Sequence, residues 1–200
     1  MKSTYLAALA LMVSPLAANA VAIVDTGATP NSGGNWSLNW SQGIAGQFTT
    51  TEDYFVSSVE GWIQNVYTAG TLTAAIYSDN AGAPGTALYT AEFTADQTDA
   101  WQGASGLAWE LLAGTYFVAF EVVSGQSFSG TLPGSAIDPL SAYAYSNGGN
   151  WYGQSLAAGF QIYGELAGEG PEPGAVPEPG SLALLGIGLM GLVWRRRVSG

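Results

Sequence analysis

Apolar and polar side chains alternate with a period of two along the central part of the chain, between short clusters of glycine, proline, asparagine and serine. In the run GTYFVAFEVV (114–123), one face carries Tyr116, Val118, Phe120 and Val122. The other face carries Thr115, Phe117, Ala119 and Glu121. No segment of this central part shows ten residues of apolar spacing at the helical period. The pattern therefore predicts an all-β domain of short antiparallel strands, a β-sandwich or jelly roll.

Composition divides the chain into a folded body and two ends. Residues 21–166 contain the alternating runs, and a body of about 145 residues can bury one core. Residues 167–180, AGEGPEPGAVPEPG, contain only glycine, proline, alanine, glutamate and valine. Such a stretch is stiffened by proline and has too few apolar side chains to build a core. We therefore expect one β-sandwich domain followed by a linker.

Residues 1–20, MKSTYLAALALMVSPLAANA, have the three parts of a secretory signal peptide. Lys2 provides the positive start, and residues 6–13 provide the apolar region. Ala18 and Ala20 are the small residues that signal peptidase requires on either side of Asn19. We expect export and cleavage after Ala20.

The other end has the features of a short membrane anchor. Residues 181–194 carry no charge and are followed directly by Arg195, Arg196 and Arg197. A helix of this length spans roughly 21 Å, less than the ~30 Å hydrocarbon core of a bilayer. Arginines after an apolar run stop translocation and stay in the cytoplasm. We expect a transmembrane helix at 181–194 in the inner membrane and a cytoplasmic tail at 195–200.

The sequence Val176, Pro177, Glu178 and Pro179, followed by an apolar run and terminal arginines, resembles the PEP-CTERM sorting signal of Gram-negative bacteria. The resemblance implies recognition by exosortase, a membrane-embedded processing enzyme, and transfer to the cell surface or the exopolysaccharide matrix. A second Pro-Glu-Pro at 171–173 lacks the preceding valine and lies further from the apolar run, so we interpret it as linker. The alternative for the whole tail is an ordinary anchor that is never removed.

Two runs in the body are similar to bacterial surface modules called choice-of-anchor domains. These runs are TLTAAIYSDNAGAPGTALYTAEF (71–93) and LAWELLAGTYFVAFEV (107–122). The resemblance concerns strands and turns, and it implies a β-sandwich. Those modules have no common activity, so the resemblance assigns no site.

Composition excludes several kinds of chemistry. The chain has a net charge of −11, lacks histidine and cysteine, and has no positive residue between Lys2 and Arg195. Nucleic-acid binding, His-based nucleophilic catalysis and zinc binding therefore lack their usual groups. A carboxylate hydrolase could draw on Glu60, Glu110 and Glu121. We expect no cofactor; calcium is the one metal that the composition tolerates, through residues that also serve ordinary turns: Asp79, Asn80, Asp96 and Asp99.

The motif GGNW occurs twice, at 33–36 and 148–151. If the first and last strands are neighbours, Trp36 and Trp151 could form one aromatic surface. Asn35 and Asn150 would then add hydrogen bonds to a glycan. The alternative is that these tryptophans cap the ends of the sandwich.

These features together predict an exported, non-enzymatic protein with a structural or adhesive role at the surface or in the exopolysaccharide matrix. A carbohydrate-binding module that uses loop tryptophans is the second interpretation, and a carboxylate hydrolase is the third. The expected partners are signal peptidase, exosortase and exopolysaccharide.

The predicted processing at both ends can be measured on protein taken from the native cell surface. Intact-mass analysis should show an N-terminus at Val21 and loss of the apolar tail. A surface form that still carries Arg195–Arg197 would contradict processing by exosortase, although it would fit the anchor alternative.

Overall fold

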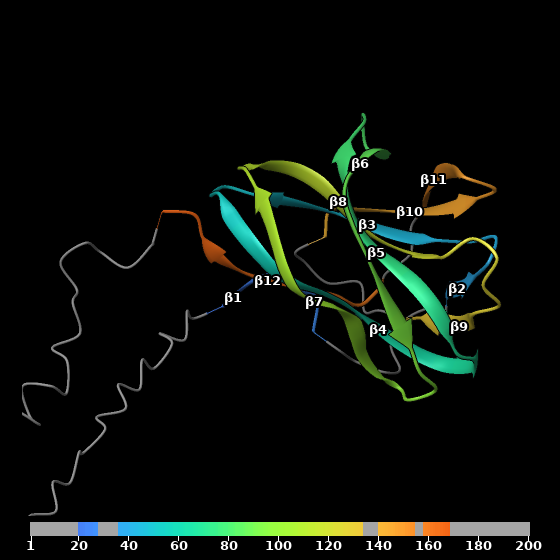
Figure 1. Ribbon diagram of the computed structural model, residues 1–200. Coiled ribbons are helices and arrows are strands. Elements are labelled where there is room, and N and C mark those ends of the chain that lie inside the picture. The colour runs from blue at the N-terminus through green and yellow to red at the C-terminus, as the bar shows by residue number, and fades with distance from the viewer. Residues whose placement is uncertain (1–19, 28–35, 134–139, 155–157, 169–200) are drawn as a thin grey trace, which may run out of the picture. The chain divides into compact units, whose positions relative to one another are not determined.

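A computed structural model describes residues 20–27, 36–133, 140–154 and 158–168, and within these ranges every regular element is a β-strand (Figure 1). The strands are β1 Val21–Asp25, β2 Trp36–Asn39, β3 Ile44–Thr50, β4 Tyr54–Thr68, β5 Gly70–Asp79, β6 Pro84–Ala95, β7 Ala100–Leu111, β8 Gly114–Val122, β9 Ser129–Leu132, β10 Ala142–Asn147, β11 Asn150–Gln154 and β12 Phe160–Leu166. The described ranges contain no helix able to cross a membrane. The chain separates into two compact units, residues 1–167 and residues 168–200. The predicted signal peptide up to Asn19, helix at 181–194 and tail at 195–200 lie outside the described residues.

The strands form two antiparallel sheets of six strands each. In the first sheet the order is β1-β12-β4-β9-β2, and β7 also pairs with β4. The second sheet has the order β11-β10-β3-β8-β5-β6. The all-β antiparallel prediction is confirmed, whereas the finer choice of a jelly roll stays a prediction. Among the described strands the first and the last are neighbours, because β1 pairs with β12, but the tryptophans of the two GGNW motifs lie on β2 and β11.

The core lies between the two sheets and follows the predicted alternation. Phe120 of β8 is fully buried between its strand neighbours, Ile44 of β3 and Ala74 of β5. Its ring stacks on Phe160 of the first sheet, with ring centroids 5.9 Å apart. Phe93 of β6 contacts the same ring edge to face at 5.6 Å. Phe120 therefore joins both sheets.

The face of β8 that carries Thr115, Phe117, Ala119 and Glu121 is not open to solvent along its whole length. Phe117 and Ala119 point away from the main core, yet both are 0% exposed. They form a second buried cluster with Ala45 and Ala144, against which Tyr77 and Trp151 pack. Phe117 is buried because aromatic side chains from other strands lie over this outer face of the second sheet. The alternation of side chains along β8 does not reveal that Tyr77 and Trp151 from other strands lie over this face.

The turn between β10 and β11 explains the second GGNW motif. Gly148 and Gly149 have φ angles of +59° and +84°, and the flanking residues Asn147 and Asn150 pair across the hairpin. Two successive positive φ angles are what a tight type I′ hairpin turn requires, and glycine adopts them without strain. The two glycines therefore fix which residues of β10 and β11 face each other.

Replacing Phe120 with alanine tests the role of its ring in joining the sheets. Phe120→Ala should lower the free energy of unfolding by roughly 3–5 kcal/mol, because it removes a fully buried aromatic ring and leaves a cavity. Phe55→Ala is the matched control, since Phe55 is 47% exposed and should cost roughly 1 kcal/mol or less. Urea unfolding measures both; equal losses would contradict the central role of Phe120.

Candidate functional site

The hairpin of β10 and β11 presents aromatic side chains on both of its faces. Tyr145 pairs with Tyr152 and Ser146 pairs with Trp151. Because successive side chains of a strand point to opposite faces, the two tyrosines lie on one face and Trp151 lies on the other. The hairpin forms one edge of the second sheet, with β11 as the edge strand (Figure 1). We call the face that carries the two tyrosines the inner face and the face that carries Trp151 the outer face.

On the inner face, three rings from both sheets form a stack. The ring of Trp36 on β2 lies 6.5 Å from that of Tyr145, with an interplanar angle of 24°. Tyr145 in turn stacks on Tyr152 at 5.4 Å and 29°. Trp36 and Tyr145 are half-buried, while Tyr152 is 47% exposed. The stack therefore begins with a half-buried ring, Trp36, and ends with an exposed ring, Tyr152.

On the outer face, Trp151 meets Tyr77 of β5 edge to face, with ring centroids 5.7 Å apart. The Tyr77 hydroxyl donates a hydrogen bond to Oε1 of Glu121 on β8. Ser146 is buried beside them, and its Oγ accepts a hydrogen bond from the backbone N–H of Gly43 at 2.7 Å. Trp151 here covers the second buried cluster.

The structure does not bring the two predicted tryptophans together on one surface. Trp36 belongs to the inner stack and Trp151 to the outer face, so each has a tyrosine as its ring partner. Asn150 is exposed, and Asn35 lies outside the described residues. The residue that joins Trp36 through the stack is Tyr152, one position after Trp151. The sequence contained a signal for this arrangement. A tight Gly-Gly turn places Tyr145 opposite Tyr152, and alternation along the strand then puts Trp151 on the other face.

Burial and the neighbouring carboxylate both act on Tyr77. Loss of solvent raises the pKa of its hydroxyl well above the usual value of about 10, and the hydrogen bond to Glu121 and the charge of Glu121 raise it further. All three effects disfavour the phenolate, because it would be a second negative charge next to a carboxylate in a partly buried site. Tyr77 therefore acts as a hydrogen-bond donor.

The three glutamates considered for hydrolysis do not form a pair. Glu121 is on the second sheet, and its carboxylate accepts the Tyr77 hydroxyl. Glu60 and Glu110 are on the first sheet, where Glu60 lies opposite Gly103 and Glu110 lies opposite Phe55. The stretch of β4 from Phe55 to Glu60 spans roughly 15 Å, whereas glycosidases hold their two carboxyl groups about 5–10 Å apart.

The acidic residues considered for calcium stabilise turns and link strands. Asp79 Oδ1 accepts hydrogen bonds from Gln47 Nε2 at 2.7 Å and from the N–H of Gly82 at 3.1 Å. Asp96 accepts from the N–H of Thr98, and Asp99 accepts from the N–H of Asn65. Across the described part of the chain, no group of three or more acidic, histidine or cysteine residues is arranged to hold a metal.

The sorting residues Val176–Pro179 and Arg195–Arg197, together with Ala18, lie outside the described residues; Ala20 is described and exposed. Comparison with protein families nevertheless finds one match at this end, in which residues 175–197 match the PEP-CTERM protein-sorting motif. No curated protein is similar enough to the chain to count as a match. The motif indicates an exported protein that is sorted at the membrane by exosortase.

The raised pKa of Tyr77 makes part of the stability depend on pH. A tyrosine whose pKa is higher in the folded than in the unfolded state contributes stability that is complete below about pH 10 and is lost as pH rises towards the folded pKa. The free energy of unfolding should therefore fall less between pH 8 and pH 11 in Tyr77→Phe than in the parent chain.

Tyr67→Phe is the control for this measurement, since Tyr67 is 79% exposed. It should keep the pH dependence of the parent. Urea unfolding at both pH values gives the difference, and equal losses in the parent and in Tyr77→Phe would rule out the coupling.

Proposed function

We propose that this chain is an exported, non-enzymatic protein with a structural or adhesive role at the cell surface or in the extracellular polysaccharide matrix of a Gram-negative bacterium. The observation that carries the proposal is the match of residues 175–197 to the PEP-CTERM protein-sorting motif. The signal peptide predicted at residues 1–20 supports it independently, since signal peptidase would act at one end and exosortase at the other. Between the two steps, the apolar run at 181–194 anchors the chain in the inner membrane.

The distribution of charge supports the same proposal. All positive side chains lie at Lys2 and at Arg195–Arg197, within the predicted signal peptide and sorting tail. Processing at both ends would leave a body with no lysine or arginine. An acidic body of this kind remains soluble and resists non-specific binding to anionic surfaces, which suits a protein that is displayed outside the cell.

The second candidate function is a carbohydrate-binding module. The stack of Trp36, Tyr145 and Tyr152 favours it, because it ends in a half-exposed tyrosine ring. Aromatic faces stack on the C–H faces of sugar rings. The hydrolase alternative has less support, since the carboxylates considered for it lie on different sheets or far apart on one sheet.

The sorting step can be tested by replacing Pro177, Glu178 and Pro179 with alanine. The unprocessed chain should then accumulate in the inner-membrane fraction, because exosortase no longer recognises it. The matched control replaces the second Pro-Glu-Pro, residues 171–173, which lies outside the matched motif. This control should be processed and reach the surface normally. Fractionation followed by immunoblotting measures both, and normal surface delivery of the 177–179 variant would refute sorting through this motif.

A further inference from the structure

Two uncharged segments, distant in sequence, meet at one end of the sandwich. Residues 36–44, which include β2 and the turn into β3, have no charged side chain, and neither do residues 144–154, which include the turn between β10 and β11. Hydrogen bonds join them: the N–H of Ser146 donates to the carbonyl of Gly43 at 2.9 Å, and the N–H of Gly148 donates to the carbonyl of Ser41 at 3.4 Å. We call this region the uncharged end. It contrasts with a chain of net charge −11.

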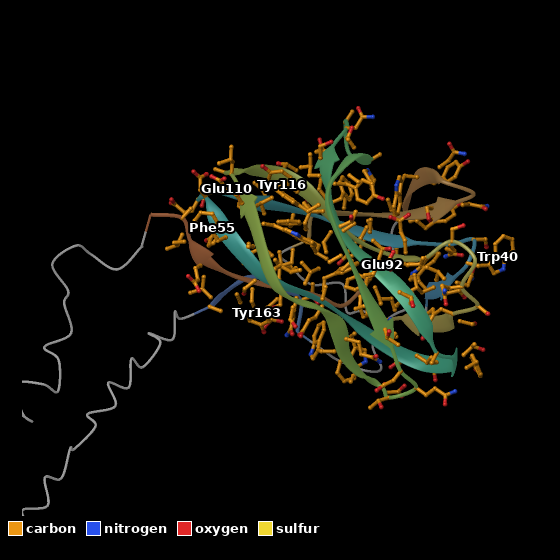
Figure 2. The ribbon with its side chains drawn as sticks, in the orientation of Figure 1. Trp40, Phe55, Glu92, Glu110, Tyr116 and Tyr163 are labelled. Atoms are coloured by element: carbon orange, nitrogen blue, oxygen red, sulfur yellow. The ribbon has the colours of Figure 1, made fainter. Side chains whose placement is uncertain are left out.

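The β2–β3 turn holds a tryptophan outward at this end. Trp40 is 79% exposed, and Figure 2 shows it projecting from the end of the sandwich opposite to Phe55. The turn itself is well ordered by hydrogen bonds. The side-chain Oδ1 of Asn39 accepts from the N–H of Ser41 at 3.0 Å and from its Oγ at 2.8 Å. Backbone bonds between Asn39 and Gln42 close the turn in both directions.

The neighbouring hairpin adds a second exposed ring and several amides. Tyr152 is 47% exposed, and its ring is held by stacking on Tyr145. Exposed amide side chains flank it on the same hairpin: Asn147, Asn150 and Gln154. The uncharged end thus combines two exposed aromatic faces with neutral hydrogen-bonding groups, which are the groups that suit a polyhydroxylated ligand.

We propose that the uncharged end binds a neutral polysaccharide, with Trp40 and Tyr152 stacking on the C–H faces of its sugar rings. The inference rests on the proposed role outside the cell and names the surface and the ligand class. Charge selects the class, because a body without lysine or arginine repels an anionic polymer. Neutral sugar hydroxyls can form hydrogen bonds with the amide groups here without electrostatic repulsion. The Tyr152 ring is already held by its stack on Tyr145, so it loses little conformational freedom on binding and its contact area contributes efficiently to affinity.

Affinity electrophoresis tests the proposal with the full chain in a mild non-ionic detergent. Native gels contain one of three neutral polymers (hydroxyethylcellulose, laminarin or galactomannan) or the anionic polymer alginate. At least one neutral polymer should slow the parent chain, and alginate should not. Trp40→Ala combined with Tyr152→Ala should weaken the retarding interaction by about tenfold or more, as removal of aromatic anchors does.

Phe55→Ala is the matched control, since Phe55 has the same 47% exposure as Tyr152 and lies at the opposite end (Figure 2). It should keep full retardation. Circular dichroism verifies folding, and Trp40→Ala alone should still weaken binding if the double variant unfolds. Lack of retardation by all three neutral polymers, or unchanged retardation of folded Trp40→Ala, would overturn the proposal. The sorting function is measured by fractionation and can fail independently.

Discussion

The folded domain, residues 21–166, has no lysine or arginine, so its carboxylates find no side-chain cation within the domain itself. Instead, neutral N–H and O–H groups donate hydrogen bonds to these carboxylates. Asp53 accepts a hydrogen bond from the backbone N–H of Ala113 at 2.6 Å, and Asp25 accepts from the N–H of Gly27 and from Gln161 Nε2. These bonds satisfy the acids at turns and strand ends. The attraction between the sheets therefore comes from apolar burial, with Phe120 and Phe160 at its centre.

The same constraint shapes the surface of the second sheet. Its outer face is covered in part by Tyr77 and Trp151, which bury Phe117 and small neighbours away from solvent. Glu121 lies beside this cover, and the Tyr77 hydroxyl supplies its hydrogen bond. A partly buried acid without a cation needs such a donor, because an unsatisfied carboxylate would carry a large desolvation cost. The aromatic cover and the acid thus depend on each other.

One end of the domain is built from segments that carry no charged side chain of their own. The β2–β3 turn and the β10–β11 hairpin contribute no charged residue, and they display Trp40 and Tyr152 to the solvent. Hydrogen bonds from the hairpin to Ser41 and Gly43 hold the two segments together. In the role that we propose, an acidic body would repel anionic polymers along most of its surface and leave this end for an uncharged ligand. This arrangement connects the composition of the chain to the role that we propose for it.

Local sequence patterns determined the strands, the main core and the sorting signal. The pleat of a strand turns apolar alternation into one buried face, which is why Leu72, Ile76 and Phe120 are buried. The sorting motif could be identified because it is a contiguous run near the terminus. Only the tertiary structure decided that Trp36 stacks on Tyr145 while Trp151 packs on Tyr77. Those contacts depend on which strands become neighbours and on how two sheets face each other, and strand periodicity carries no information about either.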